Sequence, residues 1–336
     1  MSLRGLYFFN TISVNIFPND PVPPVTRMFL KIFTEIVLKK YKPRRLIIFS
    51  RDELKQFEMA QVFSKARHNC IRYFIGDVRD KERLQRAFQG IDYIIHAAAL
   101  KQVPAAEYNP FEAVKTNILG AQNVIDIAID QKVKGVMALS TDKAANPINL
   151  YGATKLCSDK LFVAGNSYVG QNKTRFSVVR YGNVVGSRGS VIPFFKKCKK
   201  KGVFPITDPR MTRFWITLEQ AVDFVLNCMS IMVGGEIFVP KLPSMNIMDL
   251  AKAIGPNCST KVVGLRPGEK LHEVMVPRDE AINTLEYETF YLIKPAFHFF
   301  ERRFCEDGCK KVPDSFEYNS GTNTHWLTVD EMKSMC

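Results

Sequence analysis

Residues 134–155 read Lys-Gly-Val-Met-Ala-Leu-Ser-Thr-Asp-Lys-Ala-Ala-Asn-Pro-Ile-Asn-Leu-Tyr-Gly-Ala-Thr-Lys. The apolar run that ends at Ser140 predicts a buried β-strand. The polar residues Thr141, Asp142 and Lys143 follow directly at the end of this strand. Because open α/β sheets bind their ligands at the carboxyl ends of the strands, these three side chains are candidates for catalysis.

A tyrosine and a lysine follow the same strand. Pro147 interrupts the chain, and Tyr151 and Lys155 then stand four residues apart, a spacing that puts both side chains on one face of a helix. A lysine beside a phenol favours the phenolate and lowers the pKa of the tyrosine, so the pair predicts a base that acts near neutral pH. The same spacing also occurs as an exposed tyrosine and lysine without function. The neighbouring Asp142 and Lys143 favour catalysis.

Strand-like and helix-like segments alternate on either side of this stretch. The alternation predicts an α/β fold with a doubly wound parallel sheet, and its loosening after about residue 185 indicates a smaller second domain. Residues 11–17 could form a further strand. The predicted strands are 45–50, 71–75, 91–95, 134–140 and 177–181, and the predicted helices are 28–40, 52–66, 80–88 and 110–131.

Three strand ends carry residues suited to a dinucleotide cofactor. An arginine such as Arg51, next to Ser50, suits the 2′-phosphate of NADP, although Ser50 or Asp52 can equally start the next helix as an N-cap. The following strand end carries Asp77-Val78, where the aspartate can accept a hydrogen bond from adenine, or the segment is a plain turn. The third strand end carries the small residues Ala97-Ala98-Ala99, which allow a cofactor to approach the backbone.

Composition excludes several classes of protein. The net charge of +14 is compatible with nucleic acid, an anionic membrane or a phosphorylated small molecule as partner. The densest run of basic residues is Lys196–Lys201, which we interpret as a solvated helix face. No nucleic-acid-binding signature accompanies this run. The eight cysteines form no zinc pattern, no apolar run is long enough to cross a membrane, and no signal peptide is evident. We therefore expect a cytoplasmic enzyme without a metal site, a membrane segment or a nucleic-acid partner.

Taken together, these features resemble the extended short-chain dehydrogenase/reductase superfamily, and within it the inverting UDP-N-acetylglucosamine 4,6-dehydratases of the polysaccharide biosynthesis protein family. The resemblance covers roughly residues 28–333. In this family Thr-Asp-Lys beside Tyr-xxx-Lys marks a dehydratase, and the tyrosine marks the soluble, inverting branch. The matching segments are Phe49-Ser-Arg-Asp-Glu-Leu-Lys-Gln-Phe-Glu-Met59, His96-Ala-Ala-Ala-Leu-Lys-Gln-Val103, residues 140–155, Arg180-Tyr-Gly-Asn-Val-Val-Gly-Ser-Arg-Gly-Ser190, Thr212-Arg-Phe-Trp215, Arg266-Pro-Gly-Glu-Lys-Leu-His-Glu273 and Tyr318-Asn-Ser-Gly-Thr-Asn323.

The resemblance implies a role for each catalytic residue. Tyr151, with its pKa lowered by Lys155, would take the proton of the sugar 4-hydroxyl while a hydride passes to NADP. Lys143 would then remove the C5 proton, and Asp142 would protonate the departing 6-hydroxyl, for which it must hold a proton. Thr141 would bond near the reacting hydroxyls. Hydride return to C6 and reprotonation of C5 on its opposite face would give a UDP-4-keto-6-deoxy-L-hexosamine.

The resemblance also implies the substrate site and the domains. Asn183 and Arg213 would lie near the sugar diphosphate, and Arg266 and Glu269 would lie toward the uridine, unless the arginines form only surface ion pairs. A homo-oligomer and a role in surface-glycan or flagellin-sugar biosynthesis are likewise implied. The expected division is an atypical segment at 1–27, an NADP-binding Rossmann domain at 28–185, a mainly substrate-binding domain at 186–296 that partly returns to the Rossmann domain, and a C-terminal tail at 297–336.

Ahead of Met28 the chain departs from this family. Where the family carries Thr-Gly-Gly-Thr-Gly-Ser-Phe-Gly, this chain reads Pro21-Val-Pro-Pro-Val-Thr26, and proline has no N–H to offer a pyrophosphate. We hypothesise a shifted reading frame upstream of about Met28, since Pro-Val codons read one base earlier can encode Thr-Gly. As written, the segment predicts impaired NADP binding. Two alternatives to the dehydratase therefore stay open: a nucleotide-sugar epimerase or reductase, and a cofactor-deficient homologue without activity.

Overall fold

The computed structural model describes residues 11–15, 24–186, 191–297, 304 and 306–336. Within them, one sheet has the strand order β16-β14-β15-β10-β6-β5-β4-β1-β2-β3. Its strands are β1 (Thr11–Asn15), β2 (Arg45–Ser50), β3 (Ile71–Ile75), β4 (Tyr93–His96), β5 (Gly135–Thr141), β6 (Arg175–Tyr181), β10 (Ile237–Pro240), β14 (Thr284–Glu286), β15 (Phe290–Ile293) and β16 (Lys310–Lys311).

The first six strands run parallel in the spatial order 3-2-1-4-5-6, the order of a dinucleotide-binding Rossmann sheet. The predicted fold class is confirmed. The order reverses between β1 and β4, and this reversal is where such sheets bind ligands. The predicted strands recur within a few residues of their expected bounds, and the candidate residues 11–17 form β1 over Thr11–Asn15.

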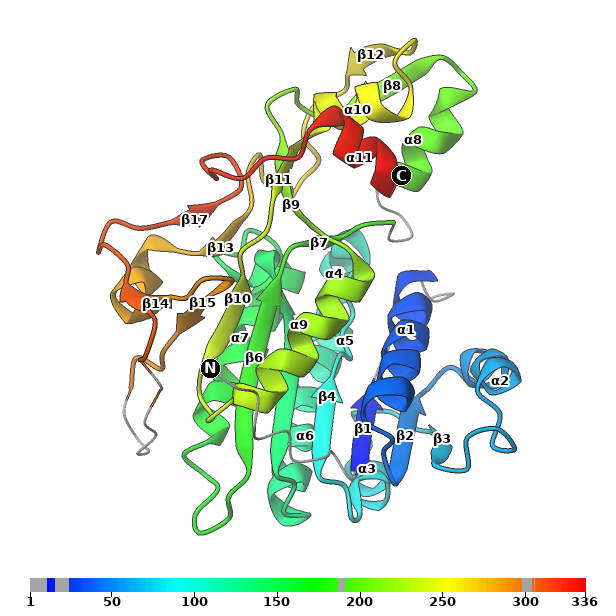
Figure 1. The fold of residues 1–336 in the computed structure, drawn as a ribbon, viewed down its shortest axis with the longest axis vertical. Coiled ribbons are helices and arrows are strands. Elements are labelled where there is room, and N and C mark those ends of the chain that lie inside the picture. Colours follow the sequence, from blue (N-terminus) through cyan, green and yellow to red (C-terminus); the bar gives the residue numbers. More distant parts are fainter. Residues whose placement is uncertain (1–10, 16–23, 187–190, 298–303, 305) are drawn as a thin grey trace.

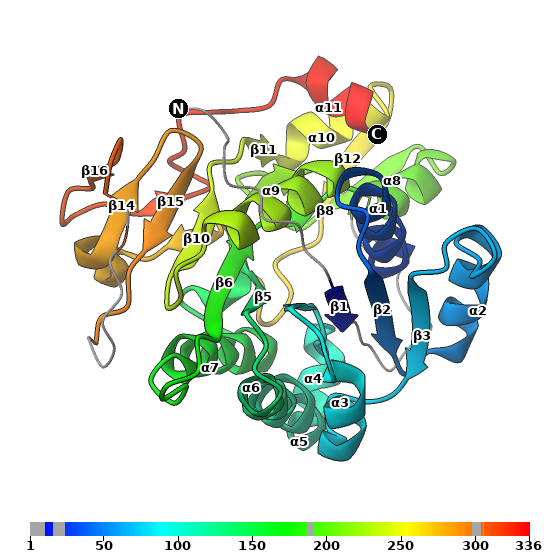
Figure 2. The same cartoon turned by 60° about the horizontal axis from the view of Figure 1, so that its bottom comes forward.

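Helices cover both faces of the sheet (Figures 1 and 2), with α1 and α9 on one face and α3, α6 and α7 on the other. The predicted helix 110–131 is interrupted by a π-helical turn, η1, and the predicted N-cap Asp80 accepts a hydrogen bond from the Arg83 backbone. The helices around the large sheet are α1 (Pro24–Lys40), α2 (Glu53–Val62), α3 (Lys81–Phe88), α4 (Val103–Tyr108), α5 (Pro110–Val114), η1 (Lys115–Leu119), α6 (Gly120–Asp130), η2 (Asp142–Ala144), α7 (Leu150–Gly165) and α9 (Leu218–Ile231).

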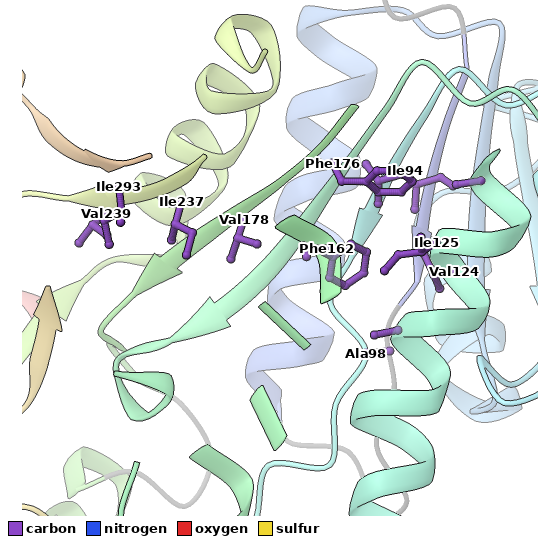
Figure 3. Packing of buried hydrophobic residues seen from close by; sticks show 14 of the residues in the cluster. Ile94, Ala98, Val124, Ile125, Phe162, Phe176, Val178, Ile237, Val239 and Ile293 are labelled. Carbon is purple, nitrogen blue, oxygen red and sulfur yellow. The ribbon is translucent and has the colours of Figure 1, made fainter. Parts of the chain in front are cut away.

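The core lies between the sheet and its helices. In Figure 3, Ile94 and Val178 from the strands meet Val124 from α6 and Phe162 from α7, and each of these four side chains is fully buried. Burial of a large apolar side chain of this kind contributes roughly 1.5–3 kcal/mol. The packing fixes α7 against β5 and β6, and α7 carries Tyr151 and Lys155.

A smaller layer stands above the carboxyl ends of the strands (Figure 1). Residues 186–296 also return to the large sheet through β10, β14 and β15, and the C-terminal segment adds α11, which packs on α10. The remaining elements are β7 (Asn183–Val184), α8 (Val191–Lys199), β8 (Val203–Ile206), β9 (Thr212–Ile216), β11 (Ser244–Asn246), α10 (Ile247–Ile254), β12 (Ser259–Val262), β13 (Val274–Val276), η3 (Arg278–Asn283), β17 (Tyr318–Asn319) and α11 (Val329–Met335).

The segment 1–27 contributes to the Rossmann sheet. β1 pairs in parallel with both β2 and β4. Helix α1 begins at Pro24, four residues before the predicted start. Residues 21–23 of the proline-rich departure lie outside the described residues, whereas residues 24–26 form the start of α1. The predicted domain bounds stay predictions. No helix in the described part of the chain is long and apolar enough to cross a membrane.

Candidate active site

The stretch 140–155 folds into a strand end, a single 3₁₀ turn and a helix start. β5 ends at Thr141, η2 spans Asp142–Ala144, and Asn149 caps α7 by accepting a hydrogen bond from the Gly152 backbone. A Cβ atom on Gly152 would lie 2.2 Å from the Lys143 carbonyl oxygen. Only glycine therefore lets the start of α7 pack this closely on η2, which brings Tyr151 next to the Asp142-Lys143 pair.

Asp142 and Lys143 form one buried cluster with a third residue that the sequence analysis did not single out. Asp142 is 1% exposed, and its Oδ1 atom accepts hydrogen bonds from Thr141 Oγ1 at 2.9 Å and from Lys143 Nζ at 3.0 Å. The Oε1 atom of Glu273 lies 3.3 Å from Lys143 Nζ and 3.7 Å from Arg213 Nε. Lys143 is thus held between two carboxylates. Burial lowers the pKa of Lys143, but both carboxylates raise it, and the net result lies well above the ordinary value.

Tyr151 and Lys155 are both buried, as expected of two residues on the inner face of α7. Burial raises the pKa of Tyr151 to about 12, and this outweighs the lowering by the Lys143 ammonium and the Thr141 hydroxyl. The net pKa of Tyr151 thus lies above its ordinary value, and the expected lowering by Lys155 stays a prediction. Burial lowers the pKa of Lys155 itself, opposed by Asp159, and Lys143 is a further cation that acts on the phenol.

A buried ionic network supports α7 beneath Lys155. Asp159 accepts a hydrogen bond from Ser140 Oγ at 2.7 Å and lies 3.7 Å from Arg180 NH2. Arg180, with no exposed surface, also donates to Glu280 Oε2 at 2.8 Å. The network therefore ties α7 to β6 and to η3.

Replacing Arg180 by methionine is expected to lower the free energy of unfolding by about 3–5 kcal/mol, because it leaves Asp159 and Glu280 without their buried counter-charge. Urea denaturation followed by circular dichroism measures the loss. Lys160→Met is the matched control: Lys160 pairs with Glu280 at 3.4 Å, but its side chain is 60% exposed. The control should cost less than about 1 kcal/mol. Equal losses in the two variants would contradict the prediction.

The π-helical turn η1 fixes the loop that follows β4. Asn117, 1% exposed, accepts from the Leu100 backbone N–H at 2.7 Å and donates to the Leu100 carbonyl oxygen and to Thr154 Oγ1. Such turns often occur at functional sites. Asn117 thereby joins the Ala97-Ala98-Ala99 segment to α7.

At the ends of β2 and β3 the predicted cofactor residues contact one another. Arg51 NH1 lies 2.9 Å from Asp77 Oδ2, and Arg79 NH2 lies 2.8 Å from the same oxygen. Burial raises the pKa of Asp77, but the hydrogen bonds from Arg79 and Arg51 hold it below its usual value. The buried Ser50 accepts a hydrogen bond from the Asp52 backbone, and Asp52 caps α2, so the N-cap interpretation holds for Asp52.

The other predicted cofactor contacts offer backbone and small side chains. Val78 is fully buried, and a Cβ atom on Gly120 would lie 2.6 Å from its Cγ2 atom, so the Val78 side chain packs against α6. Ala98 is buried, whereas Ala97 and Ala99 are partly exposed at the switch between β1 and β4. Guanidinium groups at the ends of β2 and β3 and small residues at the end of β4 are groups that a bound dinucleotide can contact.

A cavity of about 540 Å³ lies between the large sheet and the smaller layer. Its lining includes Lys143 and all four predicted substrate residues, Asn183, Arg213, Arg266 and Glu269. The Oδ1 atom of Asn183 is buried without a hydrogen-bond partner among the described residues. Arg213 donates to backbone carbonyls at Thr212, Lys270 and Leu271, which fixes its guanidinium group. Arg266 pairs with Glu269 at 2.8 Å and is 76% exposed, the ion pair that the sequence analysis weighed as its alternative.

Three charged cavity residues escaped the sequence analysis: Lys101, Lys270 and Glu273. Each lies inside a segment that carries the family resemblance: Lys101 lies in residues 96–103, and Lys270 and Glu273 lie in residues 266–273. No local pattern marks them as site residues, because the contacts that make them so come from residues far away in the chain.

Comparison with known proteins places the chain among sugar-nucleotide enzymes. Residues 29–295 match the family described as "Polysaccharide biosynthesis protein". The chain is 57% identical over 316 residues to the UDP-N-acetylglucosamine 4,6-dehydratase (inverting) of Campylobacter jejuni subsp. jejuni serotype O:2, which covers 91% of this chain and 93% of that protein. It is 41% identical over 298 residues to the UDP-glucose 4-epimerase of Rickettsia felis, covering 87% and 86%. The solved structure of Pen from Bacillus thuringiensis superposes with a TM-score of 0.85 at 36% identity, covering 98% of both chains.

Proposed function

Because the chain belongs to the polysaccharide biosynthesis protein family, we propose that it removes water from UDP-N-acetylglucosamine across C4–C6 with inversion at C5. The product is a UDP-4-keto-6-deoxy-L-hexosamine for the biosynthesis of surface glycans or flagellin sugars. The similarity to the inverting dehydratase of Campylobacter jejuni supports this assignment over epimerisation. The resemblance seen in the sequence alone led to the same family.

The observation that carries the proposal is the Asp142–Lys143 pair at the cavity wall. Epimerisation at C4 needs only hydride transfer and a base for the 4-hydroxyl. Elimination needs in addition a base for C5 and an acid for the 6-hydroxyl. A carboxylate and an ammonium group 3.0 Å apart, next to Tyr151, supply that second pair.

Tyr151 is the group for the 4-hydroxyl. Its phenol is held on α7 beside Thr141 and Lys143, and both neighbours favour the phenolate against the cost of burial. The chemistry that bound NADP supplies is hydride acceptance from C4 and hydride return to C6. The residues that would hold it are Ser50, Arg51, Asp77, Val78, Ala97, Ala98, Ala99, Tyr151 and Lys155.

Asp142 and Lys143 reach their reactive forms together. The raised pKa of Lys143 keeps it an ammonium group, which cannot take a proton. Transfer of that proton from Lys143 Nζ to Asp142 Oδ1, along the 3.0 Å hydrogen bond, produces the base and the acid in one step. Lys143 then takes the C5 proton, and Asp142 gives its proton to the departing 6-hydroxyl, which leaves as water. The pair ends as it began, an ammonium and a carboxylate.

The cavity wall suits an anionic sugar nucleotide. Arg213, Arg266, Lys101 and Lys270 bring cationic groups to the lining, and guanidinium groups match the oxygens of a diphosphate. Asn183 adds an unpaired amide oxygen for a hydroxyl or a base. We assign these residues to the UDP-sugar, with Glu269 holding Arg266 in place.

One incubation tests the proposal. Purified protein is mixed with UDP-N-acetylglucosamine and NADP, and the product is followed by NMR. A 4-keto-6-deoxy sugar with inverted C5 is the expected result, and a 4-epimer would identify the epimerase alternative. No turnover together with no NADP binding, measured by calorimetry, would identify the cofactor-deficient alternative that the prolines at 21–24 favour.

Arg51→Ala is expected to weaken NADP binding about 10- to 100-fold and to change NAD binding less than about twofold, because only NADP carries the 2′-phosphate that a guanidinium group contacts. Calorimetric titration with each cofactor measures both affinities. Arg72→Ala, an exposed arginine of β3 that bonds only to nearby backbone carbonyls in the described structure, serves as the control and should leave both unchanged. Equal losses for the two cofactors would overturn the assignment of Arg51 to NADP.

A further inference from the structure

Glu273 is the most enclosed charged group of the cavity that has no assigned role. It precedes β13, and Ser320 fixes its backbone from both sides: the Glu273 N–H donates to Ser320 Oγ at 2.9 Å, and the Ser320 N–H donates to the Glu273 carbonyl oxygen at 2.8 Å. Ser320 is fully buried and also contacts Thr212 Oγ1 at 2.8 Å. The carboxylate is therefore carried on a rigid backbone.

The carboxylate of Glu273 is only 2% exposed, yet its partners are cations of the active site. Oε1 lies 3.3 Å from Lys143 Nζ and 3.7 Å from Arg213 Nε. Oε2 is buried without a hydrogen-bond partner in the described part of the chain. A buried carboxylate is costly unless nearby charge compensates it, and here the compensating charges are those of Lys143 and Arg213.

We propose that Glu273 is a positioning residue of this site: its carboxylate holds Lys143 between itself and Asp142 and governs how readily that lysine gives up and regains its proton. The inference rests on the proposed dehydratase function. In the reaction, Lys143 becomes an ammonium group again when it takes the C5 proton. A fixed negative charge 3.3 Å away stabilises that ammonium and makes the amine a stronger base once it is neutral.

Other groups around Lys143 raise or lower its pKa, so the effect of Glu273 on that pKa must be separated from theirs. Asp142 favours the ammonium, and Arg213 opposes it. The charged and titratable groups that face Lys143 from the elements packed around it are Lys101, Asp142, Tyr151, Arg213, Lys270 and Glu273.

The test is the pH profile of Glu273→Gln, which keeps the shape of the side chain and removes its charge. The active Asp142–Lys143 pair holds one proton, which Lys143 carries until it passes to Asp142, so kcat/KM falls at alkaline pH as Lys143 loses that proton to solvent. Loss of the negative neighbour lowers the pKa of Lys143, and this alkaline fall should move at least about one pH unit toward acid. The plateau of kcat should fall about tenfold, because the amine becomes a weaker base, while KM changes less.

Two variants separate charge from structure. Glu273→Asp keeps the charge at a shorter reach, so its alkaline fall should stay within a few tenths of a pH unit of the wild-type position even if kcat falls. Glu269→Gln removes a carboxylate that lies 3.7 Å from Arg213 but does not face Lys143, so it should raise KM and leave the alkaline fall in place. An alkaline fall that does not move in Glu273→Gln, or that moves toward higher pH, would overturn the proposal.

A second measurement remains informative even if the protein proves not to be a dehydratase. The Lys143 side chain is 28% exposed, so acetic anhydride can reach it. Its rate of acetylation, read by peptide mass spectrometry across a pH series, reports the neutral fraction of Lys143 without any substrate. The same acid shift is expected in Glu273→Gln. Its absence would refute the role of Glu273, whereas its presence without turnover would refute only the proposed function.

Discussion

Lys143→Met is expected to lower kcat of dehydration at least about a thousandfold, the largest effect that we predict for a single side chain. The change removes the amine that takes the C5 proton and also the partner that delivers a proton to Asp142 across 3.0 Å. Oxidation at C4 depends on Tyr151 and should continue. The variant should therefore accumulate reduced cofactor when substrate is added, without releasing a 6-deoxy product.

Solvent exchange separates this loss from a general defect. In deuterium oxide, wild-type protein should introduce deuterium at C5 of the product, and Lys143→Met should leave C5 of recovered substrate unlabelled. Lys160→Met, a lysine replacement at an exposed site on α7, should behave as wild type in both assays. Dehydration by Lys143→Met at more than about a tenth of the wild-type rate would show that another group takes the C5 proton.

Tyr151→Phe is expected to lower kcat about 10²- to 10⁴-fold by blocking the step before elimination. In the proposed mechanism the phenol oxygen accepts the proton of the 4-hydroxyl, and without it no 4-ketone forms to acidify C5. The ring itself packs with Ala106 and Ala113, so the phenylalanine should fold as the tyrosine does. In contrast to Lys143→Met, this variant should show neither reduced cofactor nor deuterium at C5.

The double variant gives a further check on the order of the steps. If the two residues act in consecutive steps, Tyr151→Phe combined with Lys143→Met should be about as slow as the slower single variant, and the two losses should not multiply. Accumulation of reduced cofactor in Tyr151→Phe would be incompatible with the role assigned to the phenol. The thermal unfolding midpoint of each variant, measured beside the wild type, controls for loss of fold.

The fold could be predicted because its signals are local. The apolar run before Thr141 and the alternation of strands and helices predicted the parallel sheet, and the strand order 3-2-1-4-5-6 confirmed it. The start of the sheet was harder to predict. The prolines after residue 17 separated residues 11–17 from the rest of the pattern, yet Thr11–Asn15 pairs with both β2 and β4. A short strand next to an atypical loop shows too few repeats of the alternating pattern for its position in the sheet to be predicted.

The candidate site could be predicted in its parts but not in its electrostatics. Strand-end motifs identified Asp142, Lys143 and Tyr151, and the structure brings them together at the start of α7. The sequence analysis named only Lys155 as a cation for Tyr151, whereas in the structure Lys143 also lowers the pKa of the phenol, and burial nevertheless raises that pKa to about 12. Spacing along a helix shows which side chains share a face, but it does not measure burial.

By itself, the sequence determined the order of strands and helices, the Thr-Asp-Lys turn and the Tyr-xxx-Lys helix, because each of these is a pattern of neighbouring residues. The tertiary structure alone decided that Glu273 meets Lys143 at 3.3 Å, that Arg51 pairs with Asp77, and that two carboxylates raise the pKa of Lys143. These contacts join residues far apart in the chain. Their strength depends on how completely the fold excludes water around them, which no stretch of sequence specifies.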